Sequence, residues 1–185
     1  NLIIHVLNGV LIACLVCALL RTPAVRRESR LADDAATIAF LTAGLWLVHP
    51  LNLTSVLFVV QRMNSLAAGF SLLAILAYCA GRQRILAGQS GGRALVYAAF
   101  PLFGMLGVLC KENALLVLPL AAVVELCFFR FATALPRDRK LLLGFYAVTL
   151  ATPLIAAIAF IAVHPEWLTT QVGGRGFSPL ERGWT

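Results

Sequence analysis

Long apolar segments recur along this chain and restrict it to a fold embedded in a membrane. The first of them, Leu2–Leu20, has nineteen residues and no charge, and a helix of that length crosses a hydrocarbon core of about 30 Å. The chain is 61% hydrophobic and 12% charged, with a mean hydropathy of +0.90, whereas about a quarter of the residues of a soluble domain are charged. We therefore expect an all-α, polytopic integral membrane protein.

Six apolar segments predict about six transmembrane helices in one domain, residues 1–163. The spans are expected near residues 2–20, 31–49, 65–80, 94–110, 114–129 and 141–163, followed by an outer-side loop over residues 164–185. Two alternatives stay open for the middle of the chain: the third span begins near Ser65, or one long helix runs from about Leu53 to Ala80. Pro101 predicts a kink in the fourth span.

The basic residues predict how the spans are oriented. Of the 15 Lys and Arg residues, 11 fall in the connectors after the first, third and fifth spans. Short cytoplasmic loops collect Lys and Arg, so these connectors are expected in the cytoplasm, with Asn1 and His49–Ser65 on the outer side. The net charge of +7 is then a topology signal, and no nucleic-acid partner is predicted.

The cysteines do not predict a metal or redox site. Cys14 and Cys17 form a CxxC pair inside the first apolar segment, with no histidine or second pair to complete a zinc site. Packing of small buried side chains is the favoured interpretation. No group of His, Asp and Glu has the spacing of metal ligands, so we expect no metal and no cofactor.

The stretch His49–Ser65 lies among long apolar runs and yet carries several polar residues. On a helical wheel, one stripe of roughly 120°, interrupted only by Phe58, collects five polar residues: Thr54, Ser55, Gln61, Arg62 and Ser65. An arginine at the edge of a membrane costs free energy unless something uses it. This stretch is therefore predicted to line a polar cavity.

Other polar residues are expected on the same side of the membrane. The candidate substrate-binding residues are His5, Asn8, His49, Gln61, Arg62, Asn64, Lys111, Glu112, Asn113, Glu181 and Arg182. Basic side chains around an outer cavity would suit a lipid phosphate or diphosphate, so a membrane lipid is the expected partner.

Simpler structural roles stay open for several of these residues. His5 and Asn8 share a helix face and would help neighbouring helices to pack. Arg62 and Lys111 would extend to lipid headgroups, or Lys111 would pair with Glu112. Glu125, inside the fifth span, is expected to be a structural hydrogen-bond partner rather than a catalytic residue.

Four short motifs, taken in order, resemble one family of membrane glycosyltransferases. They are the opening HVLN, His49-Pro50 followed by VVQRMNSLA, the later LCKENALLVLP, and the closing FSPLERGWT. The family is that of the transmembrane and tetratricopeptide repeat-containing O-mannosyltransferases and their bacterial relatives, whose membrane domain is of the GT-C type. The resemblance covers nearly the whole chain, with the motifs in the same order. After His49-Pro50 the family usually has Thr then Glu or Gln, where this chain has Leu53 and Thr54.

The resemblance implies transfer of a sugar from a polyprenyl-phosphate carrier to a protein or glycan acceptor. The site would face the periplasm or exterior of a bacterial inner (plasma) membrane. Arg62 and Lys111 would contact the carrier phosphate, while Gln61, Asn64, Glu112 and Asn113 would shape the site and Glu181 and Arg182 would close it. The catalytic acidic residue would lie in an outer loop before Asn1 and the repeats after Thr185, so this chain is expected to be a fragment that binds without catalysing.

Two other classes of function remain as alternatives. A transporter or flippase-like protein would use the outer polar cluster as a substrate pathway, although the sequence lacks the internal repeat that is common in transporters. A structural membrane module would only anchor a repeat domain. In that case replacing Arg62 or Lys111 would leave the activity of the whole protein unchanged.

Overall fold

The computed structural model describes residues 1–28 and 30–164. These residues form helices and short connections, with no β-strand in either range. The chain divides into two compact units, Asn1–Leu143 and Gly144–Thr185, and the division falls within the last helix, α9. All the sites described below lie in the first unit.

The helices follow the apolar segments of the sequence, with short 3₁₀ and π-helical turns (η) between and within them. In chain order they are α1 (Leu2–Leu20), α2 (Pro23–Glu28), η1 (Arg30–Ala32), α3 (Ala35–Leu47), η2 (Pro50–Asn52), α4 (Leu53–Leu57), η3 (Val59–Gln61), α5 (Arg62–Leu86), α6 (Gly92–Ala94), η4 (Leu95–Ala99), α7 (Phe100–Cys110), η5 (Glu112–Leu116), α8 (Val117–Val124), η6 (Glu125–Phe129) and α9 (Pro136–Val163).

Five helical stretches of the described chain are long and apolar enough to cross a membrane: Leu2–Leu20, Val59–Leu86, Gly92–Cys110, Glu112–Phe129 and Pro136–Val163. A sixth is present if Ala35–Leu47 and Pro50–Leu57, which are bent by 56° at their junction, form one span. The second predicted span is therefore shorter than expected. The 13 residues of α3 cover only about 20 Å at 1.5 Å per residue.

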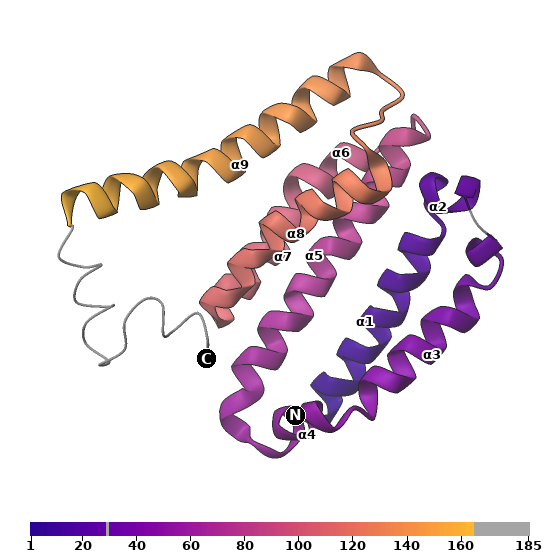
Figure 1. Ribbon diagram of the computed structural model, residues 1–185, viewed down its shortest axis with the longest axis vertical. Helices are drawn as coiled ribbons and strands as arrows, with labels where there is room; N and C mark the ends of the chain where they lie inside the picture. The colour runs from indigo at the N-terminus through magenta and orange to yellow at the C-terminus, as the bar shows by residue number, and fades with distance from the viewer. Residues whose placement is uncertain (29, 165–185) are drawn as a thin grey trace, which may run out of the picture. The chain divides into compact units, whose positions relative to one another are not determined.

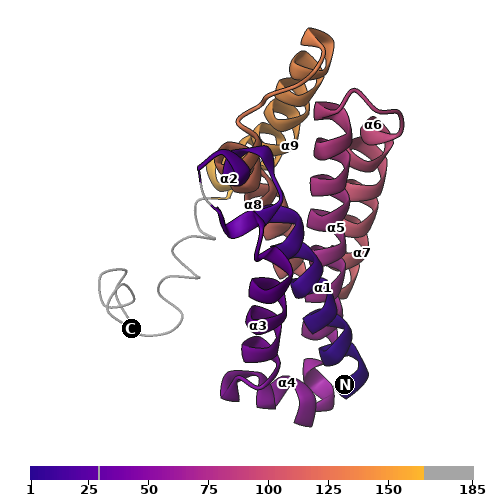
Figure 2. The ribbon, with the colours of Figure 1, turned by 90° about the vertical axis from the view of Figure 1, so that its right-hand side faces the viewer.

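Interhelical hydrogen bonds fix the directions of the helices in the first unit. Near its start, α1 donates from Asn8 Nδ2 to the carbonyl of Ser65 on α5 at 2.8 Å. Near the ends of the same two helices, Gln83 Nε2 of α5 donates to the carbonyl of Ala18 at 3.1 Å. Since the starts and the ends both meet, α1 and α5 run in the same direction, with α3 returning beside α1 and α7 beside α5 (Figures 1 and 2).

The first unit therefore has two distinct ends. We call one the His49 end, formed by Asn1, residues 47–65 and residues 110–113. We call the other the arginine end, formed by residues 20–28, 30–35, 82–93 and 129–140. The arginine end holds the 11 basic residues of the predicted cytoplasmic connectors, whereas the His49 end has Arg62 and Lys111 in the part described. The charge pattern thus predicted which residues share an end.

The prediction of one polar stripe along a continuous helix at Thr54–Ser65 is wrong. The backbone of Phe58 is extended, with φ −95° and ψ 122°, and it separates α4 from η3 and α5. The side-chain amide of Asn1 donates to the carbonyls of Val56 at 3.3 Å and Phe58 at 2.9 Å. A continuous helix would use those carbonyls for its own i→i+4 bonds, so the contact with Asn1 favours the break.

Neither alternative for residues 53–80 describes the structure fully. The long helix α5 begins at Arg62, three residues before Ser65, and α4 is a separate short helix that ends at Leu57.

The connector predicted at residues 81–93 is shorter than expected, because α5 continues to Leu86. Gly81 lies inside the helix, and a Cβ atom there would be 2.8 Å from the carbonyl oxygen of Gly92. Glycine thus allows α5 and the following helix to approach closely. The turn itself is made by Gly88 and Gly91, whose φ angles of +66° and +79° suit glycine.

Pro101 follows a π-helical turn, η4, and is the second residue of α7. A widened turn before a proline is one of the ways in which a helix accommodates the missing N–H group. The predicted irregularity therefore lies at the start of α7.

Candidate functional site

The His49 end collects the predicted site residues that the structure describes. They come from three places: the start of α1, the segment from His49 to the start of α5, and the junction of α7 with η5. Glu181 and Arg182 lie outside the described residues.

His5 and Asn8 hold the start of α1 against its two neighbours. The His5 ring stacks on Trp46 of α3 with centroids 4.7 Å apart, and its Nε2 lies 3.0 Å from the carbonyl oxygen of Leu47. Asn8 is buried and donates to the Ser65 carbonyl of α5. Both side chains therefore bind backbone carbonyls of other helices, which is what the packing interpretation of this pair predicts.

The contact between Asn8 and α5 depends on a glycine. A Cβ atom at Gly69 would be 2.7 Å from Asn8 Oδ1, which is closer than such atoms approach. Glycine at this position of α5 lets the asparagine side chain lie against the helix backbone.

Gln61, Asn64 and Ser65 form a local network at the start of α5. Asn64 Nδ2 donates to Gln61 Oε1, and Ser65 Oγ donates to the Gln61 carbonyl at 3.3 Å. Gln61 is half-buried. Its side chain and carbonyl therefore brace the first turn of α5, beside Arg62.

Arg62 is exposed and has spare hydrogen-bonding capacity. Its Nε donates to Asn1 Oδ1 at 3.1 Å, and its two Nη groups make no hydrogen bond or ion pair with residues 1–28 or 30–164. This contact links the guanidinium to the start of α1, and no described acidic residue forms an ion pair with it.

Lys111 is the second basic residue of this end. It is half-buried and has an extended backbone, with φ −162° and ψ 140°, between α7 and η5. It forms no ion pair with Glu112 or with any other described carboxylate, so the predicted pairing alternative is not seen. Glu112 and Asn113 are exposed.

Close packing of α7 against α5 sets the position of Lys111. A Cβ atom at Gly107 would lie 3.5 Å from the Ala67 carbonyl oxygen and 3.0 Å from the Ala114 Cβ atom. The end of α7 is therefore held beside the early turns of α5, and Lys111 follows one helical turn later.

His49 is exposed, and its Nδ1 accepts from the Leu51 N–H at 3.3 Å, which caps η2.

An apolar groove runs between α1 and α5 at this end. Its volume is about 170 Å³, and it is lined by Ile4, Leu7, Asn8, Leu11, Ser65, Leu66, Gly69, Phe70 and Leu73. On α5, Arg62 precedes Ser65, Leu66 and Gly69 at the i+3, i+4 and i+7 spacing of one helix face. Arg62, which does not itself line the groove, thus lies one helical turn before the first α5 residue that does.

The arginine end holds a second polar cluster, which was not predicted from the sequence as a cluster. The carboxylate of Glu125 accepts from Arg82 through two contacts, Nε to Oε2 at 2.7 Å and Nη2 to Oε1 at 2.9 Å, and from Tyr78 Oη. Arg82 and Glu125 are both 0% exposed. Arg82 was expected in a connector, whereas Glu125 has the structural role that was predicted.

This ion pair also holds the turn that follows η6. Arg130 and Phe131 have positive φ angles of 52° and 56°, a conformation that is unfavourable for residues other than glycine. Glu125 Oε1 accepts from the Phe131 N–H at 2.9 Å, and Arg82 Nη2 donates to the Ala132 carbonyl at 2.7 Å. In the sequence, only Glu125 indicated this cluster, because a lone carboxylate in an apolar run needs a partner.

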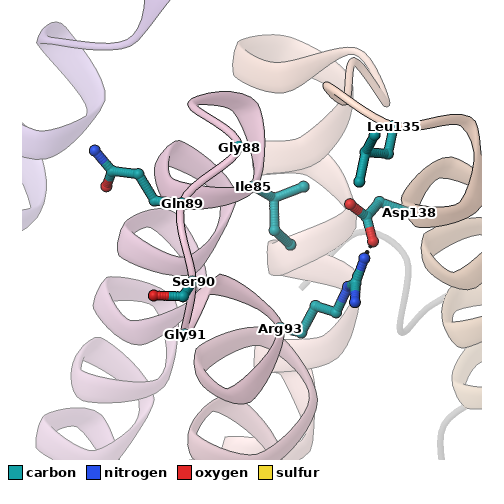
Figure 3. Close-up of a pocket in the computed structure, with 8 residues that line it drawn as sticks. All are labelled: Ile85, Gly88, Gln89, Ser90, Gly91, Arg93, Leu135 and Asp138. Carbon is teal, nitrogen blue, oxygen red and sulfur yellow. Dashed lines mark hydrogen bonds and ion pairs between the residues drawn. The ribbon is translucent and has the colours of Figure 1, made fainter.

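A polar pocket of about 390 Å³ also lies at the arginine end. Figure 3 shows Arg93 meeting Asp138 across it, with Nε and Oδ1 2.7 Å apart, while the side chains of Gln89 and Ser90 point away from that pair. No predicted site residue lines this pocket. Because the two opposite charges compensate each other, it is less suited to a charged ligand than the His49 end.

No group of three or more metal-ligating side chains occurs within residues 1–28 and 30–164. The five cysteines are free thiols. Comparisons of the sequence with models of protein families, with curated proteins and with solved structures find no match.

Proposed function

We propose that this chain is the donor-binding membrane part of a glycosyltransferase that takes a sugar from a polyprenyl-phosphate carrier on the extracytoplasmic side. The observation that carries the proposal is the pair of basic residues at the His49 end, Arg62 and Lys111, neither of which has an acidic partner in the described chain. The resemblance of the motifs around both residues to membrane O-mannosyltransferases agrees with it.

An anionic group is the expected ligand of these cations. Guanidinium groups bind phosphate oxygens through paired N–H donors, and the Nη groups of Arg62 are available for that contact. Lys111 would add a second charge from the neighbouring helix.

The apolar groove between α1 and α5 supports a lipid carrier over a water-soluble phosphate. Its lining is apolar except for Asn8 and Ser65, so an isoprenoid chain would find apolar surface along α5, starting one turn after Arg62. A soluble sugar nucleotide would have no use for that surface.

The chemistry proposed for this site is inversion at the anomeric carbon of the sugar. An acceptor hydroxyl oxygen forms a bond to that carbon while the bond from the carbon to the carrier phosphate oxygen breaks. The hydroxyl proton passes to a general base, for which the resemblance points to an acidic residue. Arg62 and Lys111 would stabilise the charge that develops on the departing phosphate.

The test is a transfer assay on the full-length protein with Arg62→Ala and Lys111→Ala, using a polyprenyl-phosphate mannose donor. Removing one such electrostatic contact should lower the transfer rate by about 10²-fold. Arg139→Ala is the matched control, because Arg139 is an exposed basic residue of the arginine end, and it should retain the wild-type rate. Wild-type transfer rates in both Arg62→Ala and Lys111→Ala would refute the proposed function.

A purely structural membrane module is the second candidate, and one observation favours it. His5, Asn8 and Ser65 all direct their side chains to backbone carbonyls, as residues that only hold helices together would do. The same two variants distinguish the candidates, since a structural module predicts that neither of them changes activity.

A further inference from the structure

A second groove lies in the first unit, between α1 and α3. Its volume is about 520 Å³, and it reaches the arginine end at Arg21. Small side chains leave the space: Ala13, Ala18, Ala36 and Ala39 lie on its walls. Gln83 of α5 also lines it, held by its hydrogen bond to the Ala18 carbonyl.

The lining of this groove is apolar apart from its end. Phe40 and Cys14 are exposed along it, and in a membrane protein such surface faces lipid chains. The groove therefore offers space for a hydrocarbon chain within the membrane-embedded part of the bundle.

Arg21 is the charged residue that lines the groove, and it is exposed. Its guanidinium makes no hydrogen bond or ion pair with any other residue in the described ranges. The groove thus ends at an uncompensated positive charge, at the end of the unit where basic residues are concentrated.

We propose that this groove binds one anionic phospholipid, with an acyl chain between α1 and α3 and the headgroup phosphate against Arg21. Charge complementarity selects the occupant, because basic pockets between transmembrane helices at the cytoplasmic side attract anionic headgroups. This site is separate from the His49 end and does not depend on the proposed transferase activity.

The proposal is tested by native mass spectrometry of the purified protein with added phosphatidylglycerol or phosphatidylcholine of identical chains. The wild-type protein should retain phosphatidylglycerol in preference to phosphatidylcholine. Arg21→Gln should reduce that preference about fivefold, since one basic residue near the surface contributes about that factor. Arg139→Gln removes a charge from the same end outside the groove and should keep the preference.

A second variant tests the chain-binding half of the site without changing charge. Ala36 is exposed at the groove wall, and Ala36→Phe should fill the space and reduce retention of the lipid. Cys14, an exposed free thiol on the α1 wall of the groove, should react more slowly with a maleimide when phosphatidylglycerol is present. Equal retention of the two lipids, an unchanged preference in Arg21→Gln, or a Cys14 labelling rate independent of lipid would each overturn the proposal.

Discussion

Arg62 and Arg82 lie at opposite ends of the same helix, α5, and their surroundings differ completely. Arg82 is fully buried and binds Glu125 through two hydrogen bonds, with a third to the Ala132 carbonyl. Arg62 is exposed and donates a single hydrogen bond to Asn1. The fold uses most of the bonding capacity of Arg82 and leaves most of that of Arg62 available. A basic residue in a membrane helix is thus a candidate binding group only when the fold does not already use it.

The largest effect is expected from removing the partner of Arg82. Glu125→Ala would leave a buried guanidinium without a carboxylate and should lower the free energy of unfolding by about 3–5 kcal/mol. Thermal unfolding in detergent, followed by circular dichroism, would measure the loss.

A double variant provides the control for that experiment. Arg82→Met with Glu125→Leu removes both charges, and apolar replacement of a buried pair is often neutral, so it should recover most of the lost stability. A Glu125→Ala protein that unfolds like the wild type would contradict the comparison, because the pair would then contribute nothing to the fold.

An intermediate effect is expected at the interface of α1 with α5. Asn8→Ala removes the hydrogen bond to the Ser65 carbonyl and should cost about 1 kcal/mol, the size of interhelical hydrogen bonds in membranes. The same unfolding measurement applies. Asn113→Ala, at an exposed asparagine of the His49 end, is the matched control and should change nothing measurable.

The smallest effect on stability is expected at Arg62. Arg62→Gln should change the free energy of unfolding by less than about 0.5 kcal/mol, because exposed residues outside such networks contribute little. A loss comparable to that of Glu125→Ala would show that Arg62 is structural after all. Little effect on folding together with a large loss of transfer would sharpen the contrast with Arg82.

The helical character of the apolar segments and the sharing of ends could be predicted from the sequence. A run such as Leu2–Leu20 identifies a span by its length alone, and basic residues concentrate in alternate connectors. Both signals are local, so they need no knowledge of which helices are neighbours. The limits of individual helices were predicted less well, because Arg82 looks like a connector residue until Glu125 is placed beside it.

The candidate site was predicted as a set of residues but not as an arrangement. The sequence identifies Arg62 and Lys111 as basic residues on the sparsely charged side, and it identifies His5 and Asn8 as polar residues within a span. It does not reveal that Asn8 reaches α5 beside Gly69, or that Arg62 donates a hydrogen bond to Asn1 at the start of α1. Those facts depend on which faces of α1 and α5 meet.

By itself, the sequence determined that this chain is helical, lies in a membrane and carries its basic residues mainly at one end. Those properties follow from the free energy of transferring whole segments into lipid, which depends on composition over about twenty residues. Only the tertiary structure decided where the helix before Arg62 breaks, and that Arg82 rather than Arg62 forms a buried ion pair. Both outcomes depend on a few hydrogen bonds between residues far apart in the chain: Asn1 with Val56 and Phe58, and Arg82 with Glu125.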